Sequence, residues 1–246
     1  MEPSARRYLV LAPMPIELRP VARAMGLHRG EDGAHRGRVA GAEVVAVLAG
    51  IGPDPARAAA RRWIDALGPA HVLVVGVAGG VRPDLPVGGL VVPAEVRATD
   101  DRVPTDLGEP RAAHPLGDAI LAGTLITTRD LITERAVHDA HQAAGVDAVD
   151  METVAVAEVC EELGLPWTAF RGISDHVDEG LLADPAILGI LGPDGAPRPT
   201  AALRALVRRP TLVRSFVRLG LGGARATKAA ARAAARAIAV DAGRTA

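Results

Sequence analysis

Three acidic residues follow apolar segments of this chain, at the points where buried strands are expected to end. Glu17 comes shortly after YLVLAP, Glu152 comes after DAVD, and Asp175 comes after WTAFRGIS. Ligands of open α/β sheets lie at the carboxyl ends of strands. A carboxylic acid there can give a proton, and a carboxylate can take one or accept hydrogen bonds from hydroxyl groups. The three residues therefore predict an acid–base site at one edge of a sheet.

A glycine-rich stretch, GVAGG at residues 76–80, follows the apolar run HVLVV. We expect a turn there, at which the backbone can approach a ligand closely. Such turns also occur in dinucleotide-binding folds, so this stretch alone has little specificity. No G-x-G-x-x-G sequence follows the first expected strand, which disfavours dinucleotide binding.

Each acidic residue also has a purely structural interpretation. Asp150 opens a helix, so capping of that helix is its default role and we assign it no chemistry. Glu152 could be an ordinary first-turn acid, Asp175 could cap the element after Ser174, and Glu17 could be a surface charge. The seven histidines show no metal-ligand spacing, and we expect neither a metal nor an organic cofactor.

Apolar runs rich in Val, Leu and Ile alternate with Ala-rich stretches along the chain. Continuous apolar runs indicate strands that are buried on both faces, and their alternation with helices indicates an α/β fold. We expect one three-layer α/β/α domain with a central, twisted, mixed sheet. The expected strands are 8–13, 42–50, 71–80, 88–93, 123–128, 147–150 and 166–174, and the clearest helices are 55–67, 133–144 and 151–163.

The composition points to a soluble protein with an aliphatic core. Hydrophobic residues make up 49% of the 246 residues, but aromatic residues only 2%. Any pocket is therefore expected to be aliphatic. The single cysteine, Cys160, excludes an internal disulfide and fits a reducing compartment. The beginning of the chain does not resemble a secretory signal, and no apolar run is long enough to span a membrane, so we expect a cytoplasmic protein.

Charge divides the chain into an acidic body and a basic tail. From Arg198 onward there are eleven basic residues and one acid, a net charge of +10, which leaves −11 on residues 1–197. We expect a catalytic domain at 1–197, a linker near 192–199, and a basic amphipathic helical extension at 198–246. The apolar face of the extension could close the core, or it could lie on a membrane surface. Nucleic-acid binding is disfavoured because only Phe216 could stack on bases.

Several sequence stretches resemble the purine nucleoside phosphorylase and nucleosidase superfamily, especially its 5′-methylthioadenosine/S-adenosylhomocysteine nucleosidase branch. These stretches are APMPIE, GVAGGV, VDMETVAVAEVCEELGLPW and FRGISDHVDE, in this order. The resemblance covers about residues 7–180. The Met-Glu and Ser-Asp pairs at their separation make it specific.

This resemblance implies roles for the matching residues. Glu152 would accept hydrogen bonds from the ribose 2′- and 3′-hydroxyls, with Met151 against the sugar. Asp175 would protonate purine N7, which requires a raised pKa, whereas the helix N-terminus should keep Glu152 ionised. Glu17 would deprotonate the attacking water, helped by Arg171. The other residues expected to line the substrate site are Val77, Gly79, Leu131, Ile132 and Ser174.

Two departures from the family pattern bear on the reaction. Val77 stands where the nucleosidases usually have serine and where the phosphorylases hold phosphate with side chains, so water is favoured over phosphate as the nucleophile. Leu131 stands near the usual position of an aromatic ring for the base. We therefore expect hydrolysis of the N-glycosidic bond of a 5′-substituted purine nucleoside. The alternatives are phosphorolysis and a non-catalytic nucleoside-binding protein.

The stretches GVAGGVRPDLPVGGLVVP and ALRALVRRPTLVRSFVRLG also resemble the hopanoid-associated phosphorylases. Members of this subfamily are thought to remove adenine from adenosylhopane. A lipid-tailed nucleoside would suit an aliphatic pocket and a tail that contacts the membrane. Homo-oligomers are usual in the superfamily, so the resemblance further implies a homodimer.

Overall fold

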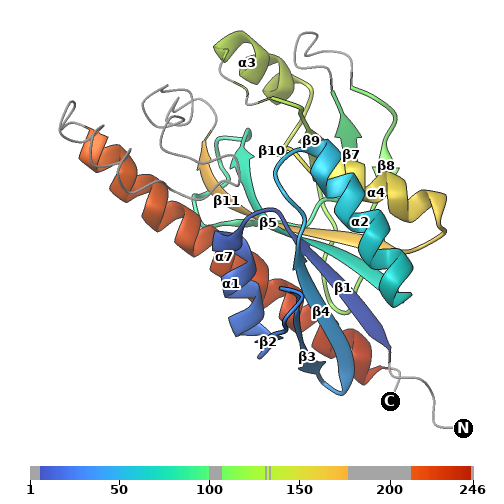
Figure 1. The fold of residues 1–246 in the computed structure, drawn as a ribbon. Helices are drawn as coiled ribbons and strands as arrows, with labels where there is room; N and C mark the ends of the chain where they lie inside the picture. Colours follow the sequence, from blue (N-terminus) through green and yellow to red (C-terminus); the bar gives the residue numbers. More distant parts are fainter. Residues whose placement is uncertain (1–5, 100–106, 131, 133, 177–211, 245–246) are drawn as a thin grey trace, which may run out of the picture.

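The structure, a computed structural model, is a three-layer α/β/α arrangement around one mixed sheet (Figure 1). It describes residues 6–99, 107–130, 132, 134–176 and 212–244, with the side chains of the last segment from residue 222 onward. The expected fold class is confirmed.

The centre of the sheet consists of long apolar strands, and short strands lie at its edges. Strand β1 pairs in parallel with β4 and β5, and β5 pairs in parallel with β11. Strand β10 lies antiparallel to β5 and parallel to β9, which makes the sheet mixed. The described strands are β1 (Arg7–Ala12), β2 (His28–Arg29), β3 (His35–Val39), β4 (Ala42–Leu48), β5 (His71–Gly80), β6 (Leu90–Val91), β7 (Glu95–Ala98), β8 (Arg111–Ala112), β9 (Thr124–Thr127), β10 (Ala148–Asp150) and β11 (Trp167–His176).

Helices cover both faces of this sheet (Figure 1). Helices α1 (Pro15–Ala24) and α7 (Leu212–Gly243) bury apolar side chains against one face. Helices α2 (Pro53–Leu67) and α4 (Thr153–Glu162) do so on the other face. Helix α3 (Arg135–Ala143) leads into β10. Each face of the sheet therefore has its own core.

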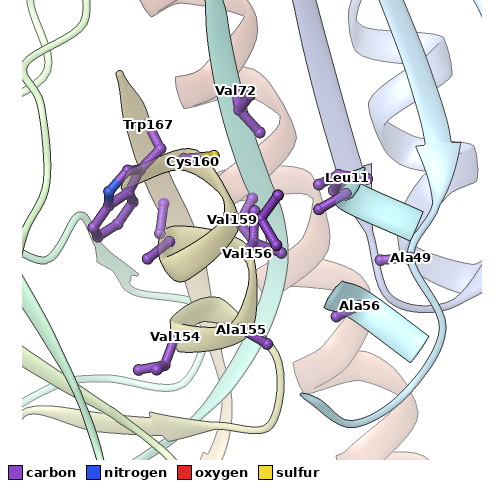
Figure 2. Close-up of a cluster of buried hydrophobic side chains, with 14 of the residues drawn as sticks. Leu11, Ala49, Ala56, Val72, Val154, Ala155, Val156, Val159, Cys160 and Trp167 are labelled. Carbon is purple, nitrogen blue, oxygen red and sulfur yellow. The ribbon is translucent and has the colours of Figure 1, made fainter. Parts of the chain in front are cut away.

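Helix α4 packs against the sheet on one side and against α2 on the other, so most of its residues are buried. Figure 2 shows Val156 and Val159 of α4 among the side chains of the sheet, while α2 lies beyond with Ala56. Trp167 and Cys160 are fully buried in the same cluster. Burial of one such large apolar side chain stabilises a fold by about 1.5–3 kcal/mol. This packing holds the N-terminus of α4, where Glu152 lies, in a fixed position.

Two local expectations about the sheet are wrong. GVAGG is not a turn, because all of residues 76–80 belong to β5. Ser174 and Asp175 do not follow the last strand but lie within β11, next to an irregularity in its pairing with β5 between Ile173 and Asp175. The strand tolerates these glycines because it is paired on both sides. Side chains from neighbouring elements approach the glycines closely and fill the space that their own side chains would occupy.

The described part of the basic tail is helix α7, which lies along the sheet (Figure 1). From residue 222 onward its buried face consists mainly of alanines, with Ile238 and Thr227, and its apolar side chains pack on Tyr8, Leu73 and Phe170. This arrangement corresponds to the interpretation in which the tail closes the core. The boundary at 197/198, the linker at 192–199, and the side chains of Leu203, Leu206, Val207, Val213, Phe216 and Val217 lie outside the described part.

Arginines of the C-terminal segment contact the body of the protein. Arg236 forms an ion pair with Asp118, and Arg244 donates a hydrogen bond to the carbonyl of Gly117. Within the described segments, none of the helices has the length and apolar character needed to cross a membrane.

Candidate active site

One fully buried arginine organises the candidate site. Arg171 lies in the middle of β11 with no exposed surface, on the face that α4 covers. Its Nη2 forms an ion pair with Asp150 and lies 3.4 Å from Glu152 Oε2. Nη2 also donates to Thr153 Oγ1 at 2.9 Å. Burial by itself would lower the pKa of Arg171, but the carboxylates around it raise that pKa above its ordinary value.

Asp150, the last residue of β10, binds this arginine and the start of α4. Its carboxylate accepts hydrogen bonds from the backbone N–H groups of Glu152 and Thr153 at 3.2–3.3 Å. It therefore does bind the free N–H groups of the helix, as expected, although Glu152 occupies the N-cap position itself. The ion pair with Arg171 was not foreseen. Asp150 thus has an electrostatic role in addition to capping.

Glu152 is directed at the beginning of α2 rather than at its own helix. Its Oε1 accepts a hydrogen bond of 2.9 Å from the backbone N–H of Gly52, the N-cap residue of α2. Burial raises the pKa of Glu152 to about 7, Arg171 opposes this rise, and Asp150 adds to it. We expected the helix dipole to keep Glu152 ionised, but burial outweighs it.

Glu17 reaches the site from the other layer of the protein. It lies in the first turn of α1 and is only 1% exposed, which excludes the surface-charge interpretation. Its two carboxylate oxygens accept hydrogen bonds of 2.8 Å from the backbone N–H groups of Met14 and Val77. Burial raises the pKa of Glu17 to about 7, although Arg171 and the two N–H groups act to lower it. A carboxylate with this pKa can take a proton at neutral pH.

Asp175 lies further along the same strand pair. Asp175 of β11 is opposite Gly79 of β5, two residues and so about 7 Å beyond Val77, whose N–H binds Glu17. The Asp175 side chain is buried, and the Ser174 hydroxyl donates a hydrogen bond to it. The structure thus places Glu152 3.4 Å from Arg171 and brings Glu17 near the same arginine beside Gly76, while Asp175 lies further along the same strand pair, at the end of β5.

The other expected site residues are distributed around this cluster. Val77 contributes its backbone, since its N–H binds Glu17 and its carbonyl lies 3.3 Å from Arg171 Nη1. Met151, between Asp150 and Glu152, is half-buried. Ile132 packs on a small apolar cluster with Val81 and Ile126. Leu131 lies outside the described residues.

Gly76 is a site residue that the sequence interpretation treated only as part of a turn. A Cβ atom on Gly76 would lie 2.5 Å from Glu17 Oε1 and 2.6 Å from Arg171 Nη1. Real Cβ contacts are not this short, so only glycine leaves room for the two charged groups to approach each other. The absence of a side chain in β5 is what permits this cluster to form.

Gly76→Ala is therefore expected to lower the free energy of unfolding by about 1–3 kcal/mol, because it forces buried charged groups apart. Urea unfolding followed by circular dichroism measures this change. Gly223→Ala is the matched control, since a Cβ there meets no atom within 4 Å. In helix α7 that change should stabilise the protein slightly. Equal behaviour of the two variants would contradict the steric role of Gly76.

A hollow of about 460 Å³ lies elsewhere, between β6, the 118–122 segment and α7. It is lined by Phe170 and other apolar residues, and its charged residues are already paired, Arg82 with Asp147 and Arg236 with Asp118. None of the three carboxylates lines it. We place the candidate site at the carboxylate cluster, because only there do unlike titratable groups converge in a buried setting. Within the described segments, no cluster of His, Cys, Asp and Glu could hold a metal ion.

Comparisons with known proteins agree on one family. The family model described as "Phosphorylase superfamily" matches residues 7–208. The 5′-methylthioadenosine/S-adenosylhomocysteine nucleosidase of Chromohalobacter salexigens is 32% identical over 165 residues, which cover 57% of this chain and 70% of that protein. The enzyme of the same name from Shewanella piezotolerans is 27% identical over 172 residues, which cover 60% and 75%.

Solved structures share the fold. The 5′-methylthioadenosine/S-adenosylhomocysteine nucleosidase of Neisseria meningitidis, in complex with methylthio-immucillin-A, superimposes with a TM-score of 0.69 at 20% identity and covers 95% of this chain and 99% of that one. Futalosine hydrolase of Helicobacter pylori gives a TM-score of 0.67 at 18% identity, with 93% and 95% covered.

Proposed function

The chain belongs to the phosphorylase superfamily, and from this premise we propose that it hydrolyses the N-glycosidic bond of a 5′-substituted purine nucleoside of the adenosine type. Two relatives, 32% and 31% identical, are 5′-methylthioadenosine/S-adenosylhomocysteine nucleosidases, so it is an enzyme of the N-glycosyl hydrolase class. The observation that carries the proposal is the convergence of two buried carboxylates on Arg171, with Asp175 beside them on the same strand pair.

The geometry supports a different chemical role for each of the three acids. Cleavage of the bond places positive charge on the sugar and negative charge on the departing base, so it needs a base for water on one side and an acid on the other. Glu17, with a pKa of about 7, is suited to deprotonate water. Asp175, hydrogen-bonded to Ser174, would protonate purine N7. Glu152 would accept hydrogen bonds from the ribose hydroxyls.

Water is the better nucleophile for this site on electrostatic grounds. The buried guanidinium of Arg171 is already surrounded by Asp150, Glu152 and Glu17. The N–H of Val77, which could otherwise bind an anion, donates to Glu17. A phosphate dianion would meet three carboxylates and one occupied cation, and an unpaired buried charge is very unfavourable. A neutral water molecule meets no such barrier.

The 5′ substituent is proposed to be apolar. Ile16 and Leu48 are both exposed, 55% and 45%, at the end of the sheet from which Glu17 reaches the site. These exposed aliphatic side chains at the start of α1 and the end of β4 would suit an apolar group on the substrate. Methylthioadenosine satisfies this requirement, and adenosylhopane satisfies it more fully.

The proposed function is tested by incubating the protein with methylthioadenosine, S-adenosylhomocysteine, adenosine, inosine and adenosylhopane, each with and without phosphate. We expect free adenine and a free reducing sugar from the 5′-substituted adenosines, at rates that do not depend on phosphate. Strict phosphate dependence, with a sugar 1-phosphate as product, would show phosphorolysis instead. Binding without release of base would show a non-catalytic protein. Glu17→Gln protein purified in parallel controls for contaminating nucleosidase.

A further inference from the structure

Four charged groups are buried together where the end of β10 and the start of α1 meet the middle of β11, and their charges do not balance. The carboxylates of Asp150, Glu152 and Glu17 are each no more than 6% exposed, and Arg171 is the cation among them. One guanidinium cannot fully neutralise three carboxylates in a buried setting. The pKa of each acid therefore depends on how close the guanidinium of Arg171 lies to its carboxylate.

Of the three acids, Asp150 makes the closest contact with this guanidinium. It makes a direct ion pair with Arg171 Nη2, whereas the nearest oxygen of Glu152 lies 3.4 Å away. No ion pair joins Arg171 to Glu17 within 4.0 Å in the described part of the chain. The positive charge of Arg171 therefore stabilises the carboxylate of Asp150 more than those of Glu152 and Glu17.

Asp150 is also the most firmly held of the three acids. Thr127 Oγ1 donates to it at 2.6 Å, and Thr153 donates both its backbone N–H and its hydroxyl. The hydroxyl of Thr153 at the same time accepts a hydrogen bond from Arg171. These partners belong to β9 and α4, so two elements besides β10 and β11 fix the position of the ion pair.

We infer that Asp150 is a positioning residue that acts through Arg171: by holding the guanidinium, it prevents Arg171 from neutralising Glu17 and Glu152. The inference rests on the proposed function, in which Glu17 must take a proton from water. A base paired closely with a guanidinium would be too weak for that task at neutral pH. Asp150 thus keeps the general base effective without touching the substrate.

The sign of the effect follows from the charges that face Glu17. Burial is the largest cause that raises its pKa to about 7, Arg171 lowers that pKa, and Asp150 raises it. The same three influences act on Glu152. Removing the charge of Asp150 takes away a repulsion and frees Arg171 to approach both glutamates. Both changes lower the pKa of Glu17, so its carboxylate form persists to lower pH but accepts a proton less readily.

Asp150→Asn is expected to move the acid limb of the pH dependence of kcat to lower pH by roughly one unit or more, because an opposite charge nearby shifts a carboxyl pKa by one to three units. It should also lower kcat at pH 8 by about tenfold, because the base is weaker. Asp147→Asn is the matched control. Asp147 is a buried aspartate just before the same strand and pairs with Arg82 outside the site. Its pH profile should equal that of the wild type.

A second variant and a second readout make the result decisive. Thr127→Val removes one hydrogen bond from Asp150 but leaves every charge in place, and it should move the acid limb in the same direction by a smaller amount. Asp150→Glu, which restores the charge, should return the limb towards that of the wild type. An unchanged acid limb in folded Asp150→Asn or Thr127→Val protein would overturn the inference.

Carboxyl ¹³C NMR titration of Glu17 in nucleoside-free protein separates this inference from the proposed function. We expect the Glu17 signal to titrate at lower pH in Asp150→Asn than in the wild type. If the wild type releases no base from any nucleoside, the proposed function fails, but the titration still decides the inference. If the wild type is active and the Glu17 titration does not move, only the inference fails.

Discussion

Asp175→Asn is expected to lower kcat for base release by about 10²-fold or more while KM changes little, because the amide cannot deliver a proton to the departing base. Asparagine keeps the size of the side chain, and its oxygen can still accept the hydrogen bond from Ser174. Steady-state release of adenine from methylthioadenosine measures the effect. Circular dichroism and the urea midpoint should match those of the wild type.

The leaving group provides the sharpest control for this role. A riboside with a 5-methylthio group and a p-nitrophenol leaving group needs no proton for departure, so its hydrolysis by Asp175→Asn should fall far less than that of methylthioadenosine. An equal loss on both substrates would mean that Asp175 supports the structure of the site rather than protonating the base. Unchanged turnover of methylthioadenosine would remove Asp175 from the reaction.

Glu17→Gln is expected to lower kcat by about 10²- to 10⁴-fold, because the attacking water then has no general base. In the wild type, burial raises the pKa of Glu17 to about 7, and activity requires the carboxylate form. Wild-type kcat should therefore decline as the pH falls below about 7. In Glu17→Gln the residual activity should lack this decline. A variant that keeps the acid limb would show that another group takes the proton.

The stability of Glu17→Gln separates loss of a base from loss of the fold. The folded-state pKa of Glu17 lies above its unfolded value, so the stability that Glu17 contributes is present below about pH 4.5 and is lost as the pH rises through 7. Glutamine does not ionise, so the variant does not lose this stability as the pH rises. The variant should therefore be at least as stable as the wild type at pH 8, although far less active. Lower stability at pH 8 would point to disruption of the Met14 and Val77 hydrogen bonds instead.

Local sequence sufficed to find the long central strands and the reactive residue types. The apolar runs at 8–13, 71–80 and 166–174 predict β1, β5 and β11, because a strand that is buried on both faces is apolar at most of its positions. The short strands β2, β3, β7 and β8 were not found. Their exposed or half-buried residues carry Arg and His, so they lack the apolar alternation on which strand prediction depends.

The sequence by itself determined which residues could do chemistry: glutamates and an aspartate near the ends of apolar strands. Only the tertiary structure decided how they share charge. The pairing of Asp150 with Arg171 joins the end of β10 to the middle of β11, and Glu17 enters from the opposite helical layer. Hydrophobic periodicity reports which face of a strand is buried, not which buried charges meet. Burial raises both pKa values to about 7 and the shared guanidinium opposes that rise, and neither influence exists until the sheet is assembled.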